Sequence, residues 1–200
     1  TTINTVYPYE AKTKSKSPIK RYALTRDSLG YITSISYHEN NSNNIFSSRI
    51  TDSDGIHKVV FENDSLGRII VSTYYDLDGN ITQRKDGVAI MKYEYDDWGN
   101  ISTLKFYAAS GKYTMNSRMY SKITNECDAW GNIVKEQFYD QNEKLCYNSD
   151  NAAQRIIEYD KNGFPLSISI LDVNGKPWVG KEDYSKVYIK CDNRGNQIEN

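Results

Sequence analysis

The chain has 200 residues, with 25 Lys and Arg against 26 Asp and Glu, and a formal net charge of −1. This near-equal number of positive and negative charges excludes a surface that binds nucleic acid through bulk positive charge. No run approaches the roughly 18 apolar residues that a transmembrane helix needs, which excludes such a segment. The chain contains 17 Tyr against 5 Phe and 12 Gly against 4 Pro, a composition that favours short strands and tight turns.

Residues 1–18 differ from the rest and are predicted to form an N-terminal extension. They carry Pro8, Pro18 and three lysines. Because proline donates no backbone hydrogen bond and lysine discourages edge pairing, we expect this segment to protect the edge of a sheet rather than to join its centre. Residues 19–200 are predicted to form a single β-repeat domain.

The motif Asp-x-x-Gly recurs along that domain in steps of 37, 32, 32, 32 and 32 residues. In a four-residue turn, the aspartate carboxylate caps the turn amides and the glycine adopts a positive φ. We call each such turn a corner and each repeat a copy, and we predict one β-hairpin per corner. The six corners are Asp27–Gly30, Asp64–Gly67, Asp96–Gly99, Asp128–Gly131, Asp160–Gly163 and Asp192–Gly195.

The residues on both sides of each corner alternate between apolar and polar. In the third copy Met91, Tyr93 and Tyr95 alternate with Ile90, Lys92 and Glu94. This period of two indicates strands, and no helical period persists anywhere. The predicted fold is therefore all-β: a tandem antiparallel β-hairpin repeat array of about six copies with a 32-residue period, forming a curved sheet or a spiral wall.

Other segments separate these hairpins. The longer first step contains the Asn- and Ser-rich stretch Asn40–Ser48, which is predicted to be a loop insertion. The connector Lys144–Ala153 is the one place where we expect a short helical turn. A second turn is predicted twelve residues after four of the corner aspartates, at Asp76–Gly79, Ala108–Gly111, Asp140–Glu143 and Asp172–Gly175.

The residues that often carry chemistry have structural explanations here. We interpret the three cysteines as small apolar fillers, because an odd, low count makes no disulfide framework. His38 and His57 occupy unrelated repeat positions, so no metal site is predicted. Glu–Asp pairs such as Glu94 and Asp96, and the calcium-like string Asp52–Gly55, are explained by turn capping. We predict no catalytic residue, no metal and no cofactor.

The candidate ligand-binding residues are aromatic. Trp98 and Trp130 occupy the same corner position 32 residues apart, and Trp178 lies in a connector. Tyr75, Tyr107 and Tyr139 each precede a second turn. A row of exposed rings would stack on sugars or grip an extended peptide. The alternative is that these rings pack over their neighbours and hold the turns.

Two corners and two second turns resemble the YD-type repeats of bacterial proteins, of which the RHS-repeat family is the best known. The similar strings are YEYDDWGN, TYYDLDGN, QFYDQNEK and IEYDKNG, and the resemblance covers roughly residues 19–200. It implies an all-β repeat wall of a secreted or surface protein that serves as shell, spacer or binding platform. The tyrosine before the aspartate is replaced by Cys127 and Cys191 in two copies and by Asn63 in another.

The predicted function is a non-enzymatic structural or binding module of a secreted or cell-envelope bacterial protein. Its leading version is ligand capture or adhesion, with a carbohydrate or protein ligand and no nucleic acid partner. One alternative is a passive spacer or shell segment of a larger secreted protein or toxin. The other is an enzyme whose site lies near the insertion Asn40–Ser48. Because the chain starts at Thr1 rather than Met, we expect it to be a mature form or a piece of a longer protein.

Overall fold

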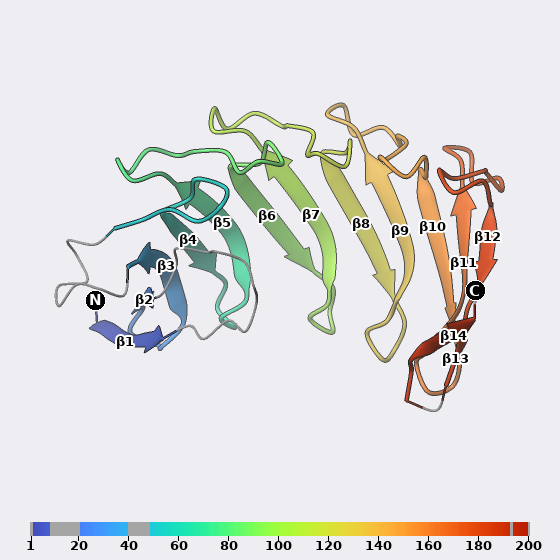
Figure 1. Ribbon diagram of the computed structural model, residues 1–200, viewed down its shortest axis with the longest axis horizontal. Helices are drawn as coiled ribbons and strands as arrows, with labels where there is room; N and C mark the ends of the chain where they lie inside the picture. The colour runs from blue at the N-terminus through green and yellow to red at the C-terminus, as the bar shows by residue number, and fades with distance from the viewer. Residues whose placement is uncertain (1, 9–20, 40–48, 193, 200) are drawn as a thin grey trace. The chain divides into compact units, whose positions relative to one another are not determined.

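The computed structural model describes residues 2–8, 21–39, 49–192 and 194–199, and every regular element in them is a β-strand (Figure 1). The predicted insertion Asn40–Ser48 and most of the N-terminal extension lie outside the described residues. The strands are β1 (Thr2–Pro8), β2 (Arg21–Arg26), β3 (Ile32–His38), β4 (Lys58–Asn63), β5 (Ile69–Tyr75), β6 (Ile90–Tyr95), β7 (Ile101–Tyr107), β8 (Lys122–Cys127), β9 (Ile133–Tyr139), β10 (Gln154–Tyr159), β11 (Pro165–Leu171), β12 (Lys186–Tyr188), β13 (Lys190–Cys191) and β14 (Gln197–Glu199).

The strands follow one another in the sheet in the order in which they occur in the sequence. β1 to β12 form one open sheet, and β13 and β14 form a second, two-stranded sheet. The registered pairs are antiparallel, for example β8 with β9 and β10 with β11. The prediction of an all-β antiparallel hairpin array is therefore confirmed, while its curved or spiral form stays a prediction.

The chain divides into two compact units, which we describe separately. Unit 1 contains Thr1–Lys92 and Tyr107–Lys112, and unit 2 contains Tyr93–Phe106 and Tyr113–Asn200. In unit 1, β1 pairs with β2 at the end of the strand order, so part of the N-terminal extension is an edge strand. The boundary between residues 1–18 and a single domain at 19–200 stays a prediction.

Each corner folds as its sequence predicts. In the second copy, Asp64 Oδ1 accepts hydrogen bonds of 2.9 Å from the backbone N–H groups of Leu66 and Arg68. Gly67 N–H donates to the Asp64 carbonyl, and Gly67 has a φ of 80°. The other five corners repeat this pattern. The bonds stabilise the ionised carboxylate: at Asp160, the Phe164 amide is the largest cause of a pKa below the ordinary value.

The predicted second turns are present, and five copies contain a third turn, of which the sequence indicated only Asp52–Gly55. In the connector Lys144–Ala153 the expected helical turn is wrong, because residues 148–151 form this third turn instead. Asn148 Oδ1 caps it by accepting hydrogen bonds of 3.0 Å from the N–H groups of Asp150 and Ala152. The third turns are Asp52–Gly55, Arg84–Gly87, Asn116–Met119, Asn148–Asn151 and Gly180–Asp183.

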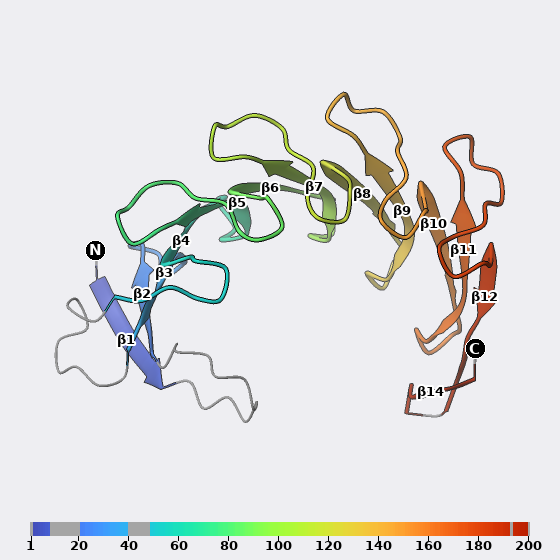
Figure 2. The ribbon, with the colours of Figure 1, turned by 45° about the horizontal axis from the view of Figure 1, so that its top comes forward.

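The best-buried side chains gather where the connectors fold back over the ends of the strands. In unit 2 the Tyr120 ring lies between those of Phe106 and Phe138, with centroid distances of 5.7 and 5.0 Å. Ala152 and Ala153 in the next connector are completely buried. Figure 2 shows these connectors as loops beyond the strand ends. The core is therefore concentrated at the connector end, while most apolar residues along the strands are only half-buried.

The last copy differs from the others because its strands are divided between two sheets. β12 pairs with β11, whereas β13 pairs with β14. In the fifth copy, by contrast, β10 pairs with both β9 and β11 within one sheet.

Neighbouring copies contact one another through the position that precedes the corner aspartate. Tyr159 OH donates a hydrogen bond of 3.0 Å to the Ile133 carbonyl of the preceding copy. Asn63 replaces this tyrosine in the second copy, and its Nδ2 donates to the equivalent carbonyl, that of Ile32, over 3.0 Å. Where Cys127 stands at this position, the amide of Asn125 donates to the equivalent Ile101 carbonyl over 3.1 Å. The second and fourth copies therefore keep this contact with the preceding copy, although neither has tyrosine before its corner aspartate.

Corner glycines also provide room for the preceding copy. A Cβ on Gly67 would lie 2.3 Å from the Tyr31 ring, and a Cβ on Gly195 would lie 2.6 Å from the Phe164 ring. A Cβ on Gly30 would meet nothing within 4 Å, although Gly30 has a φ of 90°. Gly67 is thus required for both its backbone conformation and its lack of a side chain, and Gly30 for its conformation alone.

This difference predicts unequal effects of the same substitution. Gly30→Ala should lower the free energy of unfolding by about 1–2 kcal/mol, the cost of a left-handed non-glycine residue. Gly67→Ala should lower it further, because the new methyl group displaces the Tyr31 ring. Urea denaturation measures both values. Adding Tyr31→Ala should recover part of the loss at Gly67, and equal effects of the two glycine substitutions would contradict the packing argument.

Candidate functional site

The corners of unit 2 present two tryptophans to solvent. Trp98 and Trp130 each occupy the third position of a corner, where the backbone N–H donates to the corner aspartate over 3.0 and 2.9 Å. The backbone is fixed, yet the side chains are 80% and 86% exposed. The equivalent position of unit 1 holds Leu29 and Leu66, which are also exposed. The sequence-predicted pair is therefore accessible and does not contribute to the core.

A hollow of about 230 Å³ lies beside Trp130, between its corner and the next. Its remaining lining comes from Asn132 and from Asp160–Gly163. Asn132 Nδ2 donates to Asp128 Oδ2 over 2.9 Å, which fixes its amide, while Lys161 and Asn162 are exposed. An aromatic ring thus stands next to amide, carboxylate and ammonium groups.

The predicted tyrosine row is more closely packed. Tyr75, Tyr107 and Tyr139 are half-buried. Lys92 Nζ lies 5.0 Å from the centroid of the Tyr107 ring, and Lys122 Nζ lies 4.3 Å from that of Tyr139. These cation–π contacts support the interpretation in which the rings hold the turns. A ligand-binding role for the three tyrosines stays a prediction.

The connectors hold the remaining predicted aromatic residue. The ring centroid of Trp178 lies 5.4 Å from that of Tyr147, and its side chain is partly exposed. Its place is separate from the corners that carry Trp98 and Trp130. The structure therefore does not join the predicted aromatic residues into one site.

Unit 2 also shows how this repeat holds a carboxylate. Glu143 occupies the fourth position of a second turn, with a φ of 59°. Lys122 Nζ lies 3.2 Å from Glu143 Oε2, and Tyr113 OH donates to Glu143 Oε1 over 3.1 Å. The hydrogen bond from Lys122 is the largest cause that lowers the pKa of Glu143, followed by that from Tyr113. A lysine above a tyrosine ring thus forms a carboxylate-binding position.

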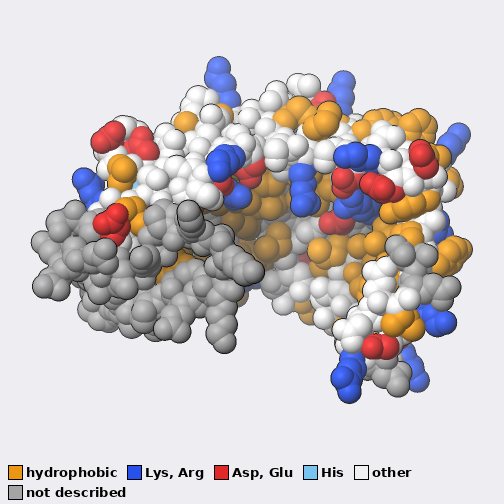
Figure 3. Space-filling model, in the orientation of Figure 1, with side chains coloured by type: hydrophobic (Ala, Val, Ile, Leu, Met, Phe, Trp, Pro, Cys, Tyr) orange, Lys and Arg blue, Asp and Glu red, His pale blue; other side chains and the backbone are white. Residues whose placement is uncertain are grey.

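The Glu–Asp pairs have the structural roles expected of them. Glu126 pairs with Lys135 over 2.6 Å, and Glu94 pairs with Lys105, so each glutamate belongs to an ion pair on its strands. Figure 3 shows acidic and basic side chains together over β8 to β10. On β10, Arg155 bridges Glu136 and Asp150. These contacts support the interpretation of the pairs as structural rather than catalytic.

The two histidines, which the sequence analysis treated as unrelated, lie together in unit 1. Their ring centroids are 5.6 Å apart, and His38 and His57 are only 3% and 7% exposed. The two are close because His38, eleven residues after the corner aspartate Asp27, lies beside His57, seven residues before the corner aspartate Asp64. Tyr37, next to His38, donates its N–H to the His57 carbonyl over 3.0 Å. The repeat register could have revealed this, whereas linear spacing could not.

Both histidines line a pocket of about 520 Å³ in unit 1. His38 Nε2 and Ser36 Oγ share a hydrogen bond of 3.0 Å, and His57 Nδ1 hydrogen-bonds the Ile50 carbonyl over 2.9 Å. Arg49, which follows the predicted insertion, also lines the pocket. Within the described residues, no group of three His, Cys, Asp or Glu side chains is placed to hold a metal ion.

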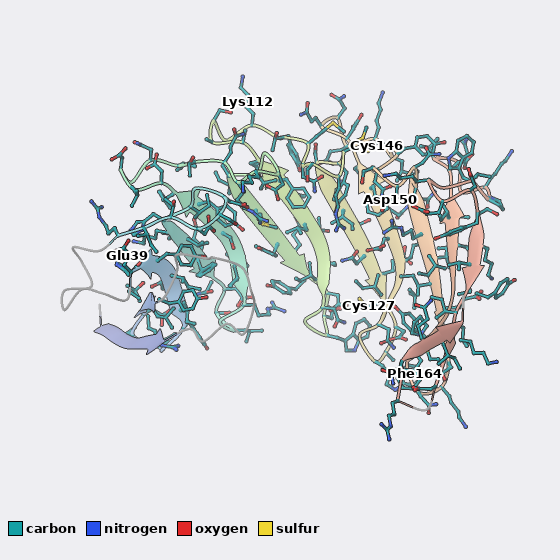
Figure 4. The ribbon with its side chains drawn as sticks, viewed as in Figure 1. Glu39, Lys112, Cys127, Cys146, Asp150 and Phe164 are labelled. Atoms are coloured by element: carbon teal, nitrogen blue, oxygen red, sulfur yellow. The ribbon has the colours of Figure 1, made fainter. Side chains whose placement is uncertain are left out.

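The three cysteines are free thiols, each half-buried. Figure 4 shows Cys127 near the corners of unit 2 and Cys146 near its connectors, at opposite ends of the strands. Burial raises the pKa of the Cys146 thiol to about 11, so it is protonated at neutral pH. These observations agree with the interpretation of the cysteines as fillers.

Comparisons with known proteins leave the family unassigned. No family model and no curated protein matches the chain. The chain is similar to the Tc holotoxin pore of Photorhabdus luminescens, with 14% identity, a TM-score of 0.43, and coverage of 89% of this chain and 9% of that one. For the TcdB2–TccC3–Cdc42 structure the identity is 14%, the TM-score 0.42, and the coverage 87% and 9%. These values are too low to support an argument about function.

Nothing in the part of the chain that the structure describes is a helix long and apolar enough to cross a membrane.

The contacts of Glu143 predict how its titration responds to a substitution. Lys122→Met removes the main group that lowers the pKa of Glu143, so the pKa should rise toward the ordinary value of a glutamate. NMR titration of the glutamate carboxyl carbons measures it. Lys161→Met, at a corner, is the matched control and should leave the pKa unchanged.

The sign of the linked stability follows from the same shift. A carboxyl with a lowered folded-state pKa contributes stability above its unfolded pKa, and this contribution is lost as the pH falls through the folded pKa. The difference in stability between Lys122→Met and the unsubstituted protein should therefore shrink in acid. An unchanged Glu143 pKa in Lys122→Met would contradict the ion pair.

Proposed function

We propose that the chain is a non-enzymatic binding module that captures a carbohydrate through the tryptophans at the corners of unit 2. The observation that carries this proposal is the exposure of Trp98 and Trp130, 80% and 86%, at equivalent positions of neighbouring hairpins. Neither ring contributes to the core, so stability does not account for them. Neighbouring hairpins place equivalent residues about 10 Å apart, twice the strand spacing, which suits successive units of an extended ligand.

The hollow beside Trp130 favours a sugar over a purely apolar ligand. A sugar ring has an apolar C–H face that stacks on an aromatic ring, and hydroxyl groups at its edge that need hydrogen-bond partners. Asn132, Asp160, Lys161 and Asn162 line the hollow and offer both donors and acceptors. A few polar groups placed around an aromatic surface are typical of small-molecule sites.

The proposed setting is a larger secreted or cell-envelope bacterial protein, within which this array serves as a structural repeat module. The support for this setting is the YD-type character of the corner sequences and their repetition as hairpins. The sequence of the longer parent protein would test it directly, by showing whether a secretion signal or further repeats accompany these residues.

Tryptophan fluorescence with a glycan array tests the ligand. A bound glycan should shift the emission of the intact protein, and Trp130→Ala should weaken binding by about tenfold or more, as expected for a central aromatic contact. Trp98→Ala should weaken binding to longer glycans more than to short ones. Trp178→Ala is the control, because Trp178 packs on Tyr147 away from the corners, and it should retain full affinity.

Three results would contradict the carbohydrate proposal. Glycan binding that survives Trp130→Ala would place the ligand elsewhere. Binding on a peptide array but not on a glycan array would show that the partner is a protein. The absence of a response on both arrays is the result that a passive spacer predicts.

A further inference from the structure

The pocket of unit 1 has a built, polar interior. Its lining includes Ser34, His38 and His57, which are at least nine-tenths buried, and the hydroxyl groups of Thr25 and Ser36. Thr25 Oγ1 and Ser34 Oγ share a hydrogen bond of 2.7 Å. The volume of about 520 Å³ falls in the range of small-molecule sites, about 300–1,000 Å³. The pocket is therefore large enough for a small hydroxylated molecule.

The repeat register shows what one side of this pocket lacks. Lys58 and Tyr75 occupy the positions that Lys122 and Tyr139 occupy in the fourth copy, and both line the pocket. In the fourth copy, Glu143 supplies the carboxylate that pairs with the lysine. The equivalent residue in the second copy is Gly79, which also lines the pocket. Glycine leaves open the place that the glutamate side chain takes.

Lys58 therefore differs from the lysines at the equivalent position of other copies, which pair with a carboxylate. Lys122 pairs with Glu143, and Lys186, one repeat after Gln154, pairs with Glu158. Among the residues that the structure describes, no carboxylate lies within ion-pairing distance of Lys58, although the side chain is only half-exposed. A partly buried ammonium group without a counter-ion gains most from an anionic ligand.

We propose that the pocket of unit 1 binds the carboxylate of a small acidic sugar, with the carboxylate on Lys58 in the place that a glutamate would take. The hydroxyl and imidazole groups of Thr25, Ser36 and His57 supply hydrogen bonds to the sugar hydroxyls. This site lies in unit 1 and uses none of the tryptophans, so it does not depend on the proposed capture of glycans by unit 2.

One of the two acidic residues at the rim, Asp76, uses its carboxylate within its own turn. Asp76 and Asp78 line the pocket as part of the second turn. Asp76 Oδ1 accepts hydrogen bonds of 2.9 Å from the N–H groups of Asp78 and Asn80, so this carboxylate is directed toward its own turn. Asp140 caps the equivalent turn in the same way in the copy that holds Glu143. Arg49, whose guanidinium donates to the Leu77 carbonyl over 3.1 Å, adds a positive charge.

Three sugars of the same ring size and different charge test the proposal by isothermal titration calorimetry. D-glucuronate is anionic, D-glucose neutral and D-glucosamine cationic. We expect D-glucuronate to bind and the other two to bind at least tenfold more weakly. Lys58→Met should weaken D-glucuronate binding at least tenfold, and the matched control Lys122→Met in unit 2 should leave it unchanged.

Substitutions at Gly79 test the position of the carboxylate. Gly79→Glu should abolish D-glucuronate binding, because the new side chain pairs with Lys58 as Glu143 pairs with Lys122. Gly79→Ala carries the same backbone strain at a φ of 85°, meets no atom within 4 Å, and should retain binding. Circular dichroism and the urea midpoint show whether each variant is folded.

The results that overturn the proposal are distinct. They are a failure of D-glucuronate to bind, equal binding of D-glucose, tighter binding of D-glucosamine, or undiminished D-glucuronate binding by folded Gly79→Glu. Because unit 2 and its tryptophans are unchanged in these variants, none of these results bears on glycan capture at the corners.

Discussion

The structure depends on a short backbone corner in which one carboxylate satisfies two amides. At each Asp-x-x-Gly, the aspartate accepts hydrogen bonds from the N–H groups two and four residues later, and the glycine adopts the left-handed conformation. Together these reverse the chain and set the register of two strands. Asparagine produces the same geometry at Asn148, whose Oδ1 accepts from the N–H groups two and four residues later.

Hairpins built in this way are not stable alone, and the contacts between copies supply what each one lacks. Burial is concentrated where connectors cover the strand ends, as around Tyr120. At the corners, Tyr31 lies over Gly67, and the residue before the corner aspartate reaches the preceding copy. The side chains of Trp98 and Trp130 stay exposed at the corners, although their backbone N–H groups bond to the corner aspartates.

The sequence predicts the hairpins because their signal is local and repeated. Aspartate, glycine and alternating strands are sufficient for the corners. Three of the five third turns lack this signal, because Met119, Asn151 and Asp183 stand in place of the glycine and adopt a positive φ of 68°, 58° and 60°. In these turns the side-chain cap or the surrounding packing, rather than glycine, determines the conformation.

The sequence predicts the tryptophans at the corners but not the pocket of unit 1, because only the tryptophans depend on a local signal. The exposure of the tryptophans follows from their place in a corner. The pocket of unit 1 requires the pairing of two strands, which brings together His38 and His57, two residues far apart in the sequence. The open place beside Lys58 becomes visible only when Gly79 is compared with Glu143 in the folded repeat. A side chain that one copy lacks becomes apparent when the copies are aligned with one another, and not when the sequence is read from end to end.

The role of the corner carboxylate can be measured most directly with two adjacent aspartates of one corner. Asp96 accepts hydrogen bonds from the N–H groups of Trp98 and Asn100, and from Asn100 Nδ2, whereas Asp97 stands beside it at the second position of the same turn. Asp96→Ala and Asp97→Ala each remove one negative charge from the same turn. The account predicts a lower urea midpoint for Asp96→Ala than for Asp97→Ala, and equal midpoints would contradict it.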